Sequence, residues 1–203
     1  IDISVETTLD TENATEAARG FTAGQERRLA EAFISRIHLE LGDLDTARIF
    51  LDKQLAEYPI NAEVPDSDRY GVALLYHRAG LLAHAMGENN TALSRFEYSA
   101  DLCLKMQAPV STAMNLINIA AIYQAAPSDN GLQAARTEKF YRLDRETWEL
   151  LEGSAATQNS LQLAEYHNTV GVSYVLMADR ASGSDPEAAV RRMNCLKHAV
   201  GHF

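Results

Sequence analysis

The strongest constraint on the fold is a fixed order of small and large residues along the sequence. In the segment AGLLAHAMGENNTALSRFEYSA, residues 79–100, the small pair Ala79-Gly80 is followed by Gly87, then by Ala92 and Phe96. A small residue in each of two helices lets their backbones approach, and a large residue fills the space beside it. The segment therefore predicts two helices that pack closely on either side of a turn at Gly87.

The same order recurs along the chain. Four pairs of residues take the same place in four predicted first helices: Ile34-Ser35, Ala79-Gly80, Ile119-Ala120 and Val170-Gly171. In the first unit the later positions are taken by Gly42, Ala47, Leu51 and a closing Pro59. Helix-start and helix-stop signals predict eight helices in four pairs. Thr22 with Gln25 and, later, Ser111 open helices, Asn89 or Asn90 caps another, and Pro186 lies in a first turn. The units span about residues 22–59, 66–107, 111–151 and 160–203.

This order resembles the tetratricopeptide repeat, whose unit carries an early Leu-Gly, a Tyr, a later Ala and Phe, and a terminal Pro. The small pairs here are 45, 40 and 51 residues apart, against a period of about 34 in that family, and no unit has the early Trp. The chain is thus similar to long-helix variants of the repeat. The resemblance implies an all-α fold, a right-handed α-solenoid of about four repeats with a concave surface where partners bind.

The resemblance also implies which side chains line the groove, because the first helix of each pair faces inward. That register gives Arg36, Leu39, Leu74, His77, Leu81, His84, Ile117, Asn118, Gln124, Asn168 and Val172. The family's best-known ligand mode clamps a peptide C-terminal carboxylate with lysines, which are missing here, so that only Arg36, near Arg78 and Asn118, offers a similar contact. The set is mostly apolar and therefore favours an amphipathic helix or an extended apolar segment. The alternative is that several of these side chains are core, since longer helices rotate the register.

Residues 1–21 form a predicted acidic arm that precedes a repeat domain at residues 22–203. The arm has five acidic residues against one arginine and little helical periodicity. We expect it to be mobile or loosely docked. Alternatively, its apolar residues lie as an extended strip along the groove. Because the sequence opens at Ile1 without a methionine, we expect it to be a segment of a longer protein.

Composition excludes several functional classes. The net charge of −10 repels a nucleic-acid phosphate backbone. The longest apolar run, residues 170–178, is too short to span a bilayer, and no signal peptide is visible. Two cysteines are too few for a disulfide framework and suit a reduced, cytoplasmic protein. We therefore expect a protein or peptide partner, with no nucleic acid and no membrane.

The residues that could carry chemistry are few. His77 and His84 share a helix face without further ligands, and Cys195, His198 and His202 share another face but lack the fourth ligand of a structural zinc site. No phosphate-binding glycine loop, HExxH, nucleophile elbow or CxxC occurs. The sequence predicts no catalytic residue, no metal and no cofactor.

The sequence thus predicts a non-catalytic scaffold that captures a partner segment in its concave groove. The alternative is a sensor or regulatory module of a larger signalling or transcription-control protein, in which the groove binds a peptide signal or a segment of the same protein.

Overall fold

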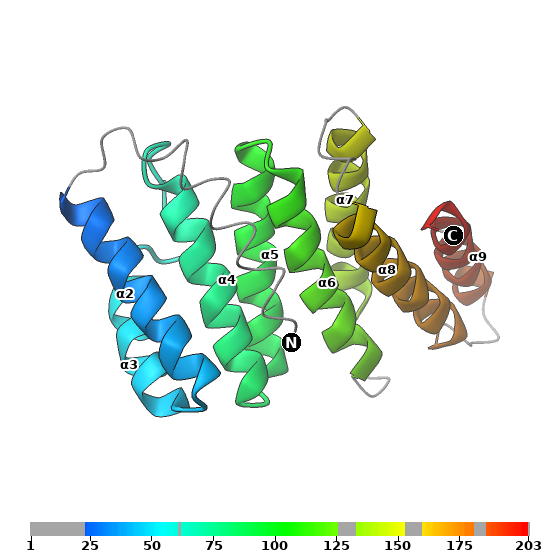
Figure 1. The fold of residues 1–203 in the computed structure, drawn as a ribbon. Helices are drawn as coiled ribbons and strands as arrows, with labels where there is room; N and C mark the ends of the chain where they lie inside the picture. Colours follow the sequence, from blue (N-terminus) through cyan, green and yellow to red (C-terminus); the bar gives the residue numbers. More distant parts are fainter. Residues whose placement is uncertain (1–22, 61, 126–132, 153–159, 181–185, 203) are drawn as a thin grey trace. The chain divides into compact units, whose positions relative to one another are not determined.

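The computed structural model describes residues 23–60, 62–125, 133–152, 160–180 and 186–202. The predicted arm, at residues 1–21, and the predicted cap Thr22 lie outside these ranges. Within them the chain is all-helical, with eight helices and no strand, so the prediction of an all-α fold is confirmed. The helices are α2 Ala23–Glu40, α3 Leu44–Leu55, α4 Arg69–Ala85, α5 Asn89–Lys105, α6 Pro109–Ala125, α7 Gln133–Glu152, α8 Ser160–Arg180 and α9 Pro186–His202 (Figure 1).

The helices belong to two compact units, each made of two of the predicted helix pairs, with the boundary between Met106 and Gln107. From here on, unit 1 means helices α2 to α5 and unit 2 means helices α6 to α9. In the first unit α2 packs against α3, and α4 packs against α5, α3 and α2 (Figure 1). In the second unit α6 packs against α7 and α8, and α8 packs against α9. Each predicted first helix thus lies beside its predicted partner.

Glycines end the first helices of unit 1 in the predicted places. Gly42 and Gly87 have φ of 75° and 76°, a left-handed conformation that suits glycine. After them, the N–H of Asp43 donates to the carbonyl oxygen of His38, and that of Glu88 to Ala83, both at 2.8 Å. These bonds satisfy carbonyls that a helix end would leave unpaired. The chain can therefore reverse tightly and lay the next helix back on the first.

The size pattern in the middle of unit 1 has the predicted physical basis. A Cβ atom added at Gly80 would lie 2.7 Å from Cε1 of Phe96, so only a glycine admits the ring. Ala79, Ala92 and Phe96 are completely buried. The ring of Phe96 also meets the ring of His77 edge to face, with 5.6 Å between centroids. Close approach of α4 and α5 is thus set by one missing methyl group.

Two predicted helix starts were wrong by a few residues. Ser111 was expected to open α6, but the helix begins at Pro109, because a first-turn position does not need the N–H that proline lacks. Asn89 or Asn90 was expected to cap α5, but Asn89 is the first helical residue, and Glu88, which precedes it, caps nothing with its side chain. The Asn89 side chain instead serves His84, as described below.

Candidate functional site

The predicted groove residues of unit 1 divide into buried and half-buried side chains. His77 and Leu81 are buried, with His77 against Phe96. Leu39 is half-buried and packs against the core formed by α3 and α4. Leu74 is half-buried. Leu74 is thus the one residue of these four that is neither buried nor packed against a described core cluster.

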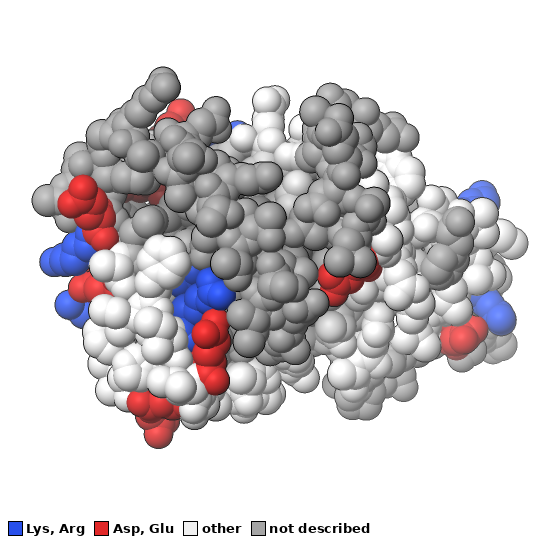
Figure 2. Space-filling model, in the orientation of Figure 1, with Lys and Arg blue, Asp and Glu red and all other residues white. Residues whose placement is uncertain are grey.

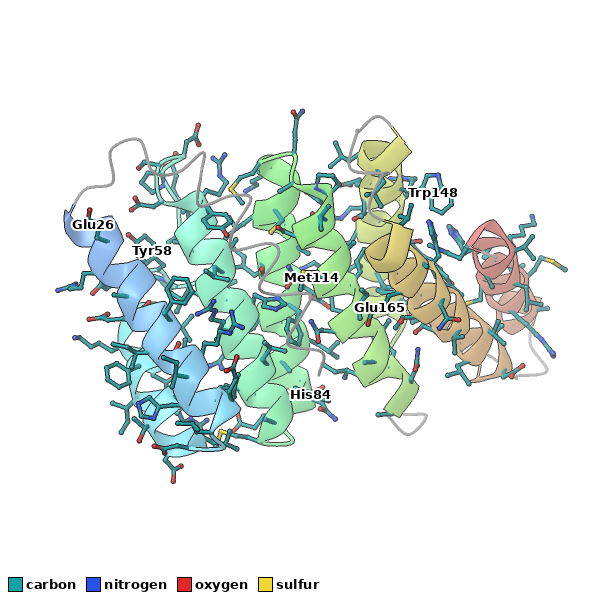
Figure 3. The ribbon with its side chains drawn as sticks, viewed as in Figure 1. Glu26, Tyr58, His84, Met114, Trp148 and Glu165 are labelled. Atoms are coloured by element: carbon teal, nitrogen blue, oxygen red, sulfur yellow. The ribbon has the colours of Figure 1, made fainter. Side chains whose placement is uncertain are left out.

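The polar groove candidates of unit 1 make local contacts. Arg36 pairs with Glu40 one turn later, with 2.7 Å between Nε and Oε1. His84, at the end of α4, lies 3.1 Å through Nδ1 from Oδ1 of Asn89 at the start of α5 (Figure 3). Both contacts hold helix ends in place and leave part of each side chain exposed.

Arg78 was grouped with Arg36 in the sequence as a possible carboxylate contact, but its guanidinium is fully buried. It donates to the carbonyl oxygen of Ala32 and lies over the ring of Phe33, 5.1 Å from the centroid. Arg78 therefore joins α4 to α2. Periodicity could not reveal this, because arginine at such a position is ordinarily read as exposed.

The predicted residues of unit 2 lie along α6 and α8. Ile117 and Val172 are half-buried, and Asn168 is exposed. Asn118 donates to the carbonyl oxygen of Met114 in its own helix at 3.0 Å. Gln124 donates to the Thr169 carbonyl oxygen at 3.1 Å and to Ser173 Oγ at 3.0 Å, so it joins α6 to α8.

Exposed apolar side chains concentrate on two helices. Ten large apolar residues are exposed among the described residues, and eight of them form two groups. The first group, called here the α2 face, is Phe33, Ile34, Ile37 and Leu41; the second, the α9 face, is Val190, Met193, Leu196 and Val200. Most members of each group are three or four residues apart, which places them on one side of the helix, and Leu41 directly follows the last residue of α2. Figure 2 shows uncharged surface over part of α2, bordered by charged side chains.

A buried carboxylate connects three helices of unit 2. Asp144 of α7 accepts a hydrogen bond from Tyr166 Oη on one oxygen; its other oxygen lies 2.8 Å from Tyr174 Oη and 3.0 Å from His202 Nε2. His202 Nδ1 lies 3.1 Å from Nδ1 of His167. We call these five residues the Asp144 cluster. Because its donors come from α8 and α9, the cluster fixes both helices against α7.

Aromatic rings surround the Asp144 cluster. The ring of His198 stacks on Tyr141 and on Tyr174, with centroids 4.8 and 5.1 Å away. Trp148 meets His202 edge to face at 5.4 Å (Figure 3). Tyr141 Oη also lies 2.6 Å from the buried Sγ of Cys195. Side chains of α7 and α9 thus meet through rings around the carboxylate.

Burial changes the pKa values of side chains in and beside the Asp144 cluster: it raises those of two tyrosines and lowers those of two histidines. It raises the pKa of Tyr166 and of Tyr174, and the nearby Asp144 carboxyl raises both further, so both hydroxyls remain donors. Burial lowers the pKa of His167 and of His198, with the neighbouring His202 lowering both further. Each of these two imidazoles is therefore more readily neutral than a free histidine.

Two cavities lie between α7 and α9. One, of about 500 Å³, is lined by Glu138, Lys139, Tyr141, Arg142, Arg145, Asn194 and His198. The other, of about 350 Å³, is lined by Asp144, Arg145, Trp148, Glu149, Lys197, His198, Gly201 and His202. Arg145 and His198 line both cavities, so we treat them as one cleft, called here the α7–α9 cleft.

The residues considered as possible metal ligands go to different partners. Cys195 contacts Tyr141, His198 stacks on Tyr141 and Tyr174, and His202 faces Asp144 and His167. Over the described part of the chain no three His, Cys, Asp or Glu side chains are arranged to hold a metal ion. The helices that the structure describes also include none long and apolar enough to cross a membrane.

Comparison with known proteins adds no assignment. No protein-family model matches the sequence, and comparisons with curated proteins and with solved structures gave no match either.

Sequence reasoning missed the Asp144 cluster, although one signal for it is present. Asp144 occupies the same face of α7 as Phe140, Thr147 and Leu151, all of which are buried. An acidic residue at the apolar phase of a helix must find donors when it is buried. The pattern could have indicated a buried carboxylate, but its partners are 22 to 58 residues away.

Proposed function

We propose that the chain is a non-catalytic scaffold, an α-solenoid of tetratricopeptide-like repeats that binds a helix or an extended segment of a protein partner. The observation that carries this proposal is the exposure of eight large apolar side chains on the α2 face and the α9 face. Contiguous exposed apolar patches mark interaction sites. A helix side with apolar residues every three or four positions suits an amphipathic partner helix.

The predicted groove remains part of this proposal. Leu74, Ile117 and Val172 are half-buried apolar side chains on first helices, and Asn168 is an exposed polar one. A partner segment in the groove of unit 1 would contact Leu74, whereas a partner helix on the α2 face would contact Ile37 and its neighbours. Both of the chain's cysteines are free buried thiols, which supports a reducing, cytoplasmic setting.

The test uses three matched substitutions. A protein that the immobilised chain retains from an extract of the source cells is identified by mass spectrometry, purified and titrated calorimetrically. Ile37→Glu disrupts the α2 face, Leu74→Glu disrupts the groove, and Ile49→Glu is the control, because Ile49 is exposed but belongs to neither surface. Circular dichroism confirms that each variant is folded.

We expect Ile37→Glu or Leu74→Glu to weaken binding at least tenfold, about 1.4 kcal/mol, while Ile49→Glu binds like the wild type. The variant that weakens binding identifies the surface. If these three variants and Met193→Glu, which disrupts the α9 face, all bind the purified partner equally well, none of the three surfaces is the docking site and the proposal is wrong.

A second candidate function is the sensor or regulatory module of a larger protein. The observation that favours it is the α7–α9 cleft, which adjoins a preorganised polar cluster. Such a cleft could take a signal molecule rather than a protein segment.

A further inference from the structure

The α7–α9 cleft has the dimensions of a ligand site. Its two cavities, of about 500 and 350 Å³, fall in the range of roughly 300–1,000 Å³ that is usual for small-molecule pockets. The lining residues lie on one side of α7, at positions 138 to 149, and on one side of α9, at positions 194 to 202. The scaffold function proposed above uses none of them.

His198 lines both cavities and packs in a group of three aromatic rings. Its ring stacks on Tyr141 and on Tyr174, and these two tyrosine rings also stack on each other, with 5.2 Å between their centroids. The imidazole makes no hydrogen bond to any residue within the described ranges. Because His198 lines both cavities, its two nitrogens can therefore bind a ligand that enters the cleft.

The lining of the cleft has a small excess of cations, whereas the chain as a whole is acidic. Lys139, Arg142, Arg145 and Lys197 line it against Glu138, Glu149 and the Asp144 carboxylate, whereas the whole chain has 28 acidic and 18 basic side chains. Asp144 already accepts its three hydrogen bonds from the cluster. Lys197 makes no ion pair with any described residue, and Arg145 is 67% exposed at 4.0 Å from Glu149. Both cations can thus turn to an incoming anion.

The wall beside these cations is aromatic. Trp148 lines the smaller cavity together with His198 and His202. Trp148 is held by ring contacts with His167 and His202, at 4.8 and 5.4 Å. The Asp144 cluster fixes α9 against α7, so the positions of these rings do not have to be ordered when a ligand binds.

We propose that the α7–α9 cleft binds a small aromatic anion, a planar ring that carries a carboxylate or a phosphate group. The anionic group lies among Arg145, Lys197 and His198, and the ring packs against Trp148 in the smaller cavity. A neutral ring or an isolated anion would use half of these contacts. This binding is independent of the partner surfaces on α2 and in the groove.

Trp148 makes the test direct, because it is the chain's only tryptophan and lines the proposed site. Its fluorescence is followed while the full chain is titrated with benzoate, phenyl phosphate, benzyl alcohol (ring without charge) or acetate (charge without ring). We expect saturable changes with the two aromatic anions and at least tenfold weaker binding of the other two. Arg145→Gln should weaken benzoate binding at least tenfold, while the control Arg192→Gln, an exposed arginine of α9 that does not line the cleft, should have no effect.

The pH dependence gives a second measurement, because a bound carboxylate favours protonated His198. The groups that face His198 are Tyr141, Asp144 and Arg145 of α7, Tyr174 of α8, and Lys197 and His202 of α9. Benzoate stays ionised between pH 8 and about pH 5.5, and burial lowers the pKa of His198, so the affinity should rise mainly toward the acidic end of this range. In His198→Phe, which keeps a stacked ring but cannot be protonated, this rise should be reduced.

Three results would overturn the proposal. The first is the absence of a saturable signal with either aromatic anion up to about 10 mM, a concentration that would detect even very weak binding. The second is equal binding of benzoate by Arg145→Gln and the wild type. The third is that benzyl alcohol binds as tightly as benzoate. None of these results bears on the scaffold function, which is tested with Ile37→Glu and Leu74→Glu in a different assay.

Discussion

Gly80 offers the sharpest test of the packing in unit 1. Gly80→Ala adds one methyl group at the point where α4 meets the ring of Phe96. That methyl would lie 2.7, 2.8 and 2.9 Å from three carbons of the ring. Gly71→Ala is a matched control in the same helix, since a Cβ atom there has no neighbour within 4 Å.

The magnitude follows from two opposed effects. Carbon atoms attract best at about 3.5–4.0 Å, so the ring and the new methyl must separate by roughly 1 Å. Phe96 is completely buried and packs against His77, so it cannot swing into solvent. Overpacking of this kind costs about 1–3 kcal/mol, while alanine in a helix interior gains up to about 1 kcal/mol over glycine. The gain applies to both variants, so the difference in unfolding free energy between them should be about 1–3 kcal/mol.

Urea denaturation followed by circular dichroism measures this difference. We expect Gly71→Ala to be as stable as the wild type or slightly more stable, and Gly80→Ala to be less stable. Gly80→Leu should cost more than Gly80→Ala, because a longer side chain must push α4 from α5. Adding Phe96→Leu should make Gly80→Ala less costly, since the smaller side chain frees space. Equal stability of Gly80→Ala and Gly71→Ala would refute the argument that Gly80 is there to admit the ring.

Three further predictions concern the turn and unit 2. Asp144→Asn should lower the unfolding free energy by about 3 kcal/mol, because its amide group faces a buried donor whichever way it turns; a change below 1 kcal/mol in urea denaturation would contradict the role of the cluster. Burial lowers the pKa of His167 and His198 from 6.5, so the unfolded chain binds more protons than the folded one as the pH falls. The melting temperature should therefore be highest above pH 6.5 and decrease below it, with a smaller decrease in a His167→Gln, His198→Gln double variant. Gly87→Ala should lower the free energy of unfolding by about 1 kcal/mol. The positive φ is the only cause, since a Cβ atom there meets nothing within 4 Å. An unchanged melting temperature in thermal denaturation would contradict this reasoning.

The parts of the fold that could be predicted from the sequence depend on residues close together in the chain. Gly87 and Ala92 lie in one turn and the helix after it, and Phe96 meets Gly80 only sixteen positions away. Short connections make neighbouring helices pack as pairs, so size and spacing suffice to identify the partners. This is why the helices, their turns and the Gly80 contact agree with the sequence.

The groove register was harder to predict because it was carried over from a family with shorter units. A helix advances 100° per residue, so a few extra residues rotate one face by a large angle. His77 and Leu81 were placed in the groove by this register, but they are buried, and Arg78 between them is buried as well. The exposed apolar side of α2 appears at Phe33 and Ile37, where the register placed no groove residue.

The two units also differ in the chemistry that holds them, and this difference explains what the sequence could reveal. Apart from the buried Arg78, unit 1 is closed by size: a glycine, alanines and one ring, all of which follow from local spacing in the sequence. In unit 2 the buried Asp144 carboxylate accepts hydrogen bonds from two other helices, and no local sequence pattern predicts which residues donate them. A core closed by size can accept other apolar residues of similar volume, whereas a buried carboxylate accepts only donors with the right geometry. The Asp144 cluster therefore positions His198 and Trp148 more strictly than apolar packing would, and strict positioning is what a small ligand requires but an apolar protein partner does not.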